Sequence, residues 1–384
     1  MQTPDYQGHC LANLMTSLIG GLGGTPSCHG PLRALPPEEV SRHRHVVLVV
    51  VDGLGDGFLR TRPAPFLNGH RRAGIHAVFP TTTATGITTF ITGDAPAQHG
   101  LTGWHVHFRE LGAVLAVLPG KPRYGGSGYD RAEGLDVLRW LGHDVTFNRI
   151  PVSSTMVAPN KIANTPFNKA HKGRARLLPF SGLQDMVNRV EQAVKGRHGN
   201  QYVYAYWSEL DSLGHYHGPD SPQTRKHLEE VDRALANLAA RLAGTDTLLI
   251  ITADHGMTAV EHRLILADHP EIADCLTLPL CGEPRVAWAY VRHGRHERFE
   301  RLVRERLGHA CTLRPSTELL EEGWFGPGTP HPELSARIGD YALLMQPGWI
   351  VSDRLLTEKP FDMKGVHGGL APEELEIPLV VTVC

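Results

Sequence analysis

Seven side chains spread along the chain are of types that bind metal ions or carry a nucleophilic hydroxyl. Several directly follow a short apolar run that is typical of a buried strand. Carboxylates and imidazoles are good zinc ligands, and a hydroxyl held beside a metal ion can become a nucleophile. The set predicts two metal ions around one hydroxyl and indicates hydrolysis of phosphate esters. Its members are Asp52, Thr83, Asp211, His215, Asp254, His255 and His367.

Two of the aspartates stand where apolar runs end. Asp52 follows His45–Val51 and precedes Gly53, which would let the backbone turn sharply. Asp-Gly is also a common turn, so Asp52 by itself is equally well explained as a turn residue. The pair Asp254-His255 repeats the pattern after a second apolar run. A metal ion is one of the few good partners for a buried aspartate, so this pair favours a ligand role.

The remaining candidate ligands lie near glycines or on a presumed helix. Asp211 and His215 are four residues apart, so one helical turn would place them on the same side. His217 competes with His215; we prefer His215 and expect His217 to lie behind the ligands or on the surface. His367 lies in the glycine-rich segment Lys364–Gly369, where a histidine can equally be a turn residue.

The threonine-rich segment Phe79–Gly93 contains the candidate nucleophile. Pro80 followed by hydroxyl residues and then apolar ones predicts a loop that enters a helix, although a threonine-rich strand or loop is also possible. The start of a helix offers free N–H groups and the positive end of the helix dipole, which suit a phosphate. Thr83 stands at that predicted start, where a metal ion could lower the pKa of its hydroxyl.

The elements that must position these residues alternate between strands and helices. Four apolar runs predict buried strands, and two amphipathic stretches between them predict helices. Alternation of this kind indicates an α/β fold with a mostly parallel sheet. In such folds, functional groups gather at the carboxyl ends of the strands. The predicted strands are 45–51, 202–207, 247–252 and 377–383, the last less central because of Pro378, and the predicted helices are 183–194 and 224–242.

Two long segments, about 104–181 and 262–364, do not follow this alternation of strands and helices. We expect both to be insertions that form a cap over the active site, so that residues 1–384 make one catalytic domain. The basic stretch 295–306 is interleaved with glutamates and is better explained as a solvated helix face.

Composition excludes several classes of partner. The net charge is −2, without the clustered basic stripe of a protein that binds nucleic-acid polymers. No run approaches the roughly 20 apolar residues of a membrane span. Residues 11–22 predict a short amphipathic helix stopped by Gly20 and Gly21 rather than a signal peptide. The six cysteines lack CxxC spacing and are typical of reduced thiols, although a Cys275–Cys281 bridge is conceivable. We therefore expect a cytoplasmic protein.

The order of these motifs resembles the alkaline phosphatase superfamily, and within it the nucleotide pyrophosphatase/phosphodiesterase branch. The resemblance runs from Asp52 to Gly369 and leaves the two long segments uncovered. Its motifs are Asp-Gly after the first strand, Phe-Pro-x-x-Thr before a helix ending in Thr-Gly, His-Gly at 99–100, Asp-x-x-x-His-x-x-Gly-Pro, Asp-His-Gly and Gly-x-His-Gly-Gly.

The resemblance implies a three-layer α/β/α fold and a site with two divalent metal ions, zinc being the expected metal. One zinc would be bound by Asp211, His215 and His367, and the other by Asp52, Asp254 and His255. Thr83 would lie between them, attack phosphorus and form a phospho-threonine intermediate, which water activated at the other zinc would hydrolyse. The expected substrate is a small phosphodiester or pyrophosphate, and esters that contain a nucleotide are among the candidates.

One departure from the branch bears on substrate choice. Members that cleave diesters commonly carry an asparagine shortly after the His-Gly motif, whereas this chain offers Trp104 there. Trp104 is therefore a candidate substrate contact that can donate one hydrogen bond or stack. No arginine beside Thr83 is available for a dianionic monoester, although Lys161, Arg174 or Arg176 could reach the site. The alternatives are a phosphomonoesterase or phosphonoacetate-type hydrolase on the same metal core and, more distantly, a non-catalytic metal-binding protein.

Overall fold

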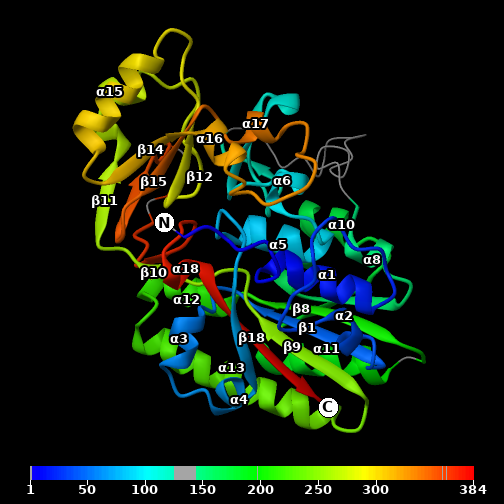
Figure 1. Cartoon of the computed structure of the whole chain (residues 1–384). Coiled ribbons are helices and arrows are strands. Elements are labelled where there is room, and N and C mark those ends of the chain that lie inside the picture. Colours follow the sequence, from blue (N-terminus) through cyan, green and yellow to red (C-terminus); the bar gives the residue numbers. More distant parts are fainter. Residues whose placement is uncertain (1, 125–143, 197, 357, 360) are drawn as a thin grey trace.

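A seven-stranded sheet forms the centre of the computed structural model, which describes residues 2–124, 144–196, 198–356, 358–359 and 361–384 (Figure 1). Its strand order is β2-β18-β9-β1-β8-β6-β7. The strands span Arg71–His76 (β2), Glu376–Val383 (β18), Thr247–Thr252 (β9), His45–Val51 (β1), Gln201–Trp207 (β8), Ser153–Pro159 (β6) and Arg176–Phe180 (β7). All four predicted strands are present, with bounds that differ by at most one residue.

The sheet is mostly parallel, as predicted. β18 runs antiparallel to both of its neighbours, β2 and β9. Pro378 lies in the part of β18 that pairs with β2, and pairing with β9 begins only at Val380. Proline has no backbone N–H to donate to a neighbouring strand. At Pro378 this is tolerated, because this part of β18 pairs only with the edge strand β2.

Helices cover both faces of this sheet (Figure 1). On one face, α11 (Leu183–Lys195) contacts β6, β7 and β8, and α13 (Pro222–Leu242) packs on α11 and on α4 (Pro65–His70). On the other face, Phe90 of α5 (Thr83–Thr92) contacts the ring of Tyr204 in β8, and α1 (Leu11–Gly21) and α8 (Thr146–Arg149) pack against α5. The predicted helices 183–194 and 224–242 are confirmed, and the result is the expected three-layer arrangement.

The first helix differs from its prediction in one respect. It ends at Gly21 as expected, but residues 11–19 are buried all round rather than on one side. It is covered by α5 and by α2 (Pro37–Val40), so both of its flanks face protein.

None of the helices in the described ranges is both long and apolar enough to cross a membrane. The six cysteines form no disulfide within the described structure. The cytoplasmic location stays a prediction.

A second seven-stranded sheet is antiparallel and has the order β14-β15-β13-β12-β3-β4-β5. Its strands come from both long segments that were predicted to cap the core, so parts of the two segments share one sheet. The strands span Cys311–Pro315 (β14), Tyr341–Met345 (β15), Val286–Ala289 (β13), Cys281–Gly282 (β12), His105–Phe108 (β3), Ala113–Ala116 (β4) and Lys121–Pro122 (β5).

The segment 104–181 is divided between the two sheets, which differs from its prediction as an insertion. Its β3, β4 and β5 join the second sheet, whereas β6 and β7 complete the parallel sheet beside β8. β6 has neither a long apolar run nor an alternating pattern, because three hydroxyl residues precede Met156, Val157 and Ala158, so its sequence did not indicate a strand. Residues 125–143 of this segment lie outside the described residues.

Shorter elements complete the structure. Two small pairs, β10 with β17 and β11 with β16, stand apart from the large sheets. The strands of these pairs span Thr258–Ala259 (β10), Gly365–Val366 (β17), His262–Ile265 (β11) and Trp349–Ser352 (β16). The further helices are α3 (Asp56–Arg60), α6 (Pro96–His99), α9 (Asn160–Ala163), α10 (Pro166–His171), α12 (Glu209–His217), α14 (Pro270–Ala273), α15 (His296–Leu307), α16 (Ser316–Glu321), α17 (Leu334–Arg337) and α18 (Pro372–Leu375).

Candidate metal centre

Three neighbouring strands bring most of the predicted ligands to one edge of the parallel sheet. β1 lies between β9 and β8, so the carboxyl ends of all three strands meet. Asp52 directly follows β1, and Asp254 follows β9 by two residues. Asp211 and His215 lie on α12, the helix that follows β8. Gly53 adopts a φ of 74°, which provides the sharp turn expected after Asp52.

The first group of ligands consists of Asp211, His215 and His367. One ligand atom from each lies within 4.8 Å of the others. His215 Nε2 is 3.3 Å from Asp211 Oδ2, as the spacing of four residues on a helix predicts, and His367 Nε2 is 3.8 Å from Asp211 Oδ1. His217 is exposed, so it does not compete for this place. Three groups with the chemistry of zinc ligands therefore converge here.

The second group lies next to the first. His255 Nε2 is 3.3 Å from Asp52 Oδ1 and 3.5 Å from Asp254 Oδ2. Asp211 also approaches this group, because one of its ligand atoms lies within 4.8 Å of those of Asp52 and His255. The rings of His255 and His367 stack with centroids 3.7 Å apart, which joins the two groups. All six predicted ligands are thus neighbours; their division between two metal ions stays a prediction.

The three imidazoles are oriented in the same way. Each Nδ1 faces a backbone carbonyl: His215 that of Gly365 at 2.8 Å, His255 that of Gly256 at 2.9 Å, and His367 that of Thr81 at 3.1 Å. A carbonyl can only accept, so Nδ1 carries the proton in each ring. Each Nε2 faces the carboxylates and, in a neutral ring, has a free lone pair. This is how metal-binding histidines are commonly held.

The carboxylates are incompletely hydrogen-bonded, and they are buried at Asp52 and Asp254 and partly buried at Asp211. The structure leaves three oxygens without a hydrogen-bond partner among the described residues: Asp52 Oδ1, Asp211 Oδ1 and Asp254 Oδ2. Asp52 is 2% exposed and Asp254 is fully buried. An unpaired buried carboxylate oxygen is costly, and a bound cation would remove that cost. The donor set therefore fits divalent metal ions.

The shifted pKa values of Asp52 and His215 also indicate that the carboxylates of this site lack a positively charged partner. Burial, with the neighbouring carboxylates of Asp254 and Asp211, raises the pKa of Asp52 well above its usual value. Burial disfavours the charged form of His215, but the carboxylate of Asp211 outweighs it and raises the pKa of His215 to about 9. In this arrangement protons neutralise part of the carboxylate charge, a role that a divalent cation can take over.

Thr83 is the first residue of α5, as predicted, and its hydroxyl faces the ligands. Thr83 Oγ1 lies 3.0 Å from His255 Nε2, and the residue is 8% exposed. α5 packs directly on the site, since a Cβ added to Gly86 would lie 2.8 Å from the Cβ of Asp254. The helix is ten residues long and presents its first turn of N–H groups beside the hydroxyl.

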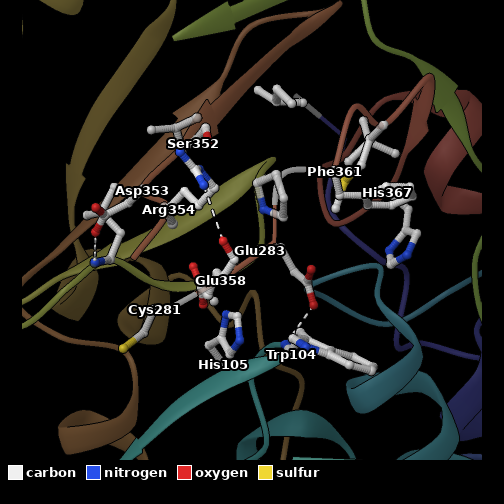
Figure 2. A pocket seen from close by; sticks show the side chains of 18 of the residues that line it. Trp104, His105, Cys281, Glu283, Ser352, Asp353, Arg354, Glu358, Phe361 and His367 are labelled. Atoms are coloured by element: carbon white, nitrogen blue, oxygen red, sulfur yellow. Dashed lines mark hydrogen bonds between the residues drawn. The ribbon is translucent and has the colours of Figure 1, made fainter. Parts of the chain in front are cut away.

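Two cavities meet at Thr83, and both are lined by Thr83, Trp104 and Asp211. We name them by the sheet that they adjoin. The core-side cavity, about 460 Å³, has many apolar and aromatic lining residues, including Ile87, Ile91, Leu118, Met156, Phe167, Tyr204 and Tyr206, and two lysines, Lys121 and Lys161. The cap-side cavity, about 480 Å³, has more charged lining residues, including Glu283, Asp353, Arg354 and Glu358, which Figure 2 labels. Arg123, Arg263 and Lys359 also line it.

Of the three basic residues that were predicted to reach the site, only Lys161 lines one of the two cavities. Lys161 lines the core-side cavity, where Lys121 joins it. Arg174 instead donates to the carbonyls of Phe147 and Ile150, and it does not line either cavity. Arg176 is exposed on β7. Trp104, 38% exposed, lies where the two cavities join, so its predicted contact with substrate is possible from either side.

Pattern reasoning missed two residues that contact the site. The hydroxyl of Tyr206 donates to Asp52 Oδ2, and Glu283 accepts a hydrogen bond from the hydroxyl of Thr82, next to Thr83. β8 carries three tyrosines, Tyr202, Tyr204 and Tyr206, so the sequence shows buried hydroxyls in this strand but does not single out Tyr206. Glu283 carries no local signal, because its contacts bridge 201 residues of sequence.

Comparisons with known proteins agree with this geometry. Residues 46–370 match the family described as type I phosphodiesterase / nucleotide pyrophosphatase. Human ectonucleotide pyrophosphatase/phosphodiesterase family member 5 is 25% identical over 348 residues, which cover 84% of this chain and 65% of that protein. The chain therefore spans less than two thirds of that relative.

Two solved structures show the same fold. One is murine ectonucleotide pyrophosphatase/phosphodiesterase 5 in an inactive threonine-to-alanine form, in complex with AMP. It has a TM-score of 0.66 and 20% identity, covering 88% of this chain and 87% of that chain. The other is phosphonoacetate hydrolase from Sinorhizobium meliloti 1021 in complex with phosphonoacetate, with a TM-score of 0.63 and 18% identity over 88% and 90% of the two chains.

The resemblance seen in the motifs is thus confirmed, and so is the alkaline phosphatase-like fold. The family match begins at the second residue of β1 and ends just after the loop that carries His367. It therefore contains all seven predicted site residues. This chain belongs to the type I phosphodiesterase / nucleotide pyrophosphatase family of the alkaline phosphatase superfamily.

Proposed function

We propose that this protein is a metal-dependent hydrolase that cleaves phosphodiester or pyrophosphate bonds, with Thr83 as the nucleophile. The observation that carries the proposal is the convergence of six ligand-type side chains, four buried and two partly buried, around one hydroxyl. Three carboxylate oxygens among them have no hydrogen-bond partner within the described structure, and His255 Nε2 lies 3.0 Å from the hydroxyl of Thr83. Family membership supports phosphoester hydrolysis as the reaction class.

The residues have separate tasks in a two-step reaction. Divalent ions bound by the six ligands would lower the pKa of the Thr83 hydroxyl and neutralise charge on the phosphoryl group. Thr83 Oγ forms a bond to phosphorus while the bond to the leaving oxygen breaks. Water then cleaves the phospho-threonine and restores the hydroxyl. The N–H groups at the start of α5 lie beside Thr83, where they can hold a phosphoryl oxygen.

The two cavities favour a substrate with a substituent on each side of the phosphorus. A diester or a pyrophosphate has two such arms, whereas a monoester has one. The core-side cavity offers aromatic walls and two lysines, which suit a ring-containing arm with an anionic or hydroxylated part. The AMP complex of the murine neighbour supports a nucleotide as that arm.

A paired rate assay on zinc-loaded protein tests the proposal. It compares bis-p-nitrophenyl phosphate and the p-nitrophenyl ester of thymidine 5′-monophosphate with p-nitrophenyl phosphate. We expect the two diesters to have the higher kcat/KM. Preference for the monoester, or turnover of phosphonoacetate alone, would reject the diesterase assignment and direct attention to Lys121 and Lys161 as the anion-binding groups.

Chelation supplies the second half of the test. Removal of metal with EDTA should abolish turnover, and added Zn²⁺ should restore it. Other divalent ions should be compared in the same assay, because the ligands alone do not decide which metal the protein takes up. A rate that is unchanged after complete metal removal, verified by elemental analysis, would reject the two-metal route. Metal binding without turnover of any ester would favour the non-catalytic alternative.

A further inference from the structure

Three consecutive threonines at the start of α5 reach to three different parts of the protein. Thr81 Oγ1 donates to the carbonyl of Gly369 at 2.6 Å, in the loop that carries His367. Thr83 Oγ1 faces His255. Thr82 Oγ1 donates to Glu283 Oε1 at 2.5 Å, across the boundary with the second sheet. The backbone next to the nucleophile is therefore held by the second sheet as well as by the core.

The orientation of Thr82 is unusual for its position. It is the N-cap residue of α5, where a threonine hydroxyl normally accepts a hydrogen bond from an N–H of the first turn. Here the side chain makes no such bond. Its hydroxyl is directed to Glu283 instead, so the helix gives up its side-chain cap for a contact with the second sheet.

Glu283 makes a second short contact beside the site. The same Oε1 atom accepts the backbone N–H of Trp104 at 2.6 Å, the bond drawn between Glu283 and Trp104 in Figure 2. Glu283 is 8% exposed. One buried oxygen thus connects the residue before the nucleophile with the residue at the junction of the two cavities.

The turn that carries Glu283 is itself fixed. Glu283 N donates to the carbonyl of Val286, and Val351 N donates to that of Pro284. Arg285 forms a buried ion pair with Glu374, with Nη2 and Oε2 3.0 Å apart. It also donates to the backbone carbonyls of Gln346, before β16, and of Trp349, the first residue of β16. A rigid turn can impose a position on the groups that it binds, whereas a mobile one would follow them.

We infer that Glu283 is a positioning residue for the proposed reaction, which sets the start of α5, and with it the Thr83 hydroxyl, through its hydrogen bond from Thr82. Within the described structure the carboxylate of Glu283 is hydrogen-bonded to Thr82 and Trp104 and not to the ligands or Thr83, so its proposed effect on Thr83 passes through Thr82. The inference rests on the proposed function. Displacement of a nucleophile by about 1 Å can cost on the order of 10²-fold in rate.

The test uses three substitutions in the full-length, zinc-loaded protein. Glu283→Ala removes the acceptor, and we expect kcat for the preferred ester to fall by roughly 10- to 100-fold with a smaller change in KM. Glu283→Gln keeps an oxygen that can accept both hydrogen bonds, and kcat should return to within about three-fold of the parent. Thr82→Val removes the donor and should lower kcat to the same degree as Glu283→Ala.

The double variant Glu283→Ala/Thr82→Val separates positioning from general damage. If the two residues act through one hydrogen bond, it should be no slower than the slower single variant. Zinc content and melting temperature of each variant are measured in parallel, and Glu318→Ala, on a remote exposed pair with Arg314, is the control expected to match the parent.

Three results would overturn the inference. The kcat of Glu283→Ala could lie within about two-fold of the parent value, or the kcat of Glu283→Gln could be as low as that of Glu283→Ala. The third is a double variant whose fold-loss in kcat equals the product of the two single fold-losses. Failure of the proposed function looks different, because the parent protein itself would then turn over no phosphodiester or pyrophosphate.

Discussion

The predicted ligands share a feature that surface histidines and aspartates lack: their unused lone pairs point toward one another. Each imidazole is tied at Nδ1 to a backbone carbonyl, and three carboxylate oxygens have no partner among the described residues. Such an arrangement is unfavourable without a cation and stable with one. Thr83 adds a hydroxyl that a purely structural metal site would not need.

Thr83→Ala tests the nucleophile. We expect zinc content to stay at the parental level and kcat to fall by at least about 10³-fold, because the covalent route is lost while the ligands remain. Elemental analysis and a diester assay measure the two quantities. Thr61→Ala, at the exposed end of α3, serves as the control. Near-normal turnover of Thr83→Ala would reject Thr83 as the nucleophile.

Asp254→Asn tests the second group of ligands. The substitution replaces a buried carboxylate that lacks one partner by a neutral amide, so affinity for one metal ion should fall by at least about ten-fold. Competition with a chromophoric zinc chelator measures that affinity. The surface substitution Asp246→Asn is the matched control. Parental affinity in Asp254→Asn would show that this aspartate binds no metal.

The helix α5 connects the nucleophile to the sheet through close approach at a glycine. A Cβ at Gly86 would lie 2.8 Å from Asp254 Cβ and 3.0 Å from its carbonyl oxygen. Neither group can move without disturbing a predicted ligand, because Asp254 ends the buried β9 region. The absence of a side chain at this position therefore sets the distance between helix and ligands.

Gly86→Ala should consequently reduce activity more than it reduces folding. We expect kcat to fall by roughly 10- to 100-fold and stability by about 1–3 kcal/mol, as in other overpacked cores. Urea unfolding and the diester assay give the two values. Gly57→Ala, in α3, meets no atom within 4 Å and should be neutral or slightly stabilising. An active Gly86→Ala protein would mean that α5 can shift without cost.

The two sheets form a continuous structure around the site. The buried pair of Arg285 and Glu374 joins the second sheet to the segment just after His367. Glu374 also accepts the N–H of Gly369 at 2.8 Å, so one carboxylate holds both sides of the boundary. Both side chains are almost fully buried, which makes loss of either partner expensive.

Glu374→Ala should therefore destabilise the protein by about 3–5 kcal/mol, because it leaves a buried guanidinium without its partner. Thermal or urea unfolding measures the change. Glu318→Ala, which breaks the exposed pair with Arg314, should leave stability almost unchanged. A small effect at Glu374 would imply that water or another group readily replaces the carboxylate.

The sequence by itself predicted four of the seven strands of the parallel sheet and a set of site residues that the structure brings together. Buried parallel strands appear as apolar runs, so His45–Val51 and Thr247–Thr252 were evident, and the polar residue after each run was marked as functional. The spacing of Asp211 and His215 also predicted their contact, because helical geometry is local. Order and spacing of the motifs were sufficient to find the family.

Only the tertiary structure decided how distant segments meet. β6 and β7 join the parallel sheet, and the two long segments share one antiparallel sheet; both outcomes depend on pairing between strands far apart in the chain. The approach of Asp211 to both ligand groups, the two cavities at Thr83 and the contact of Glu283 with Thr82 have the same origin. Such contacts leave no periodic pattern, because each joins residues whose local sequences do not constrain one another.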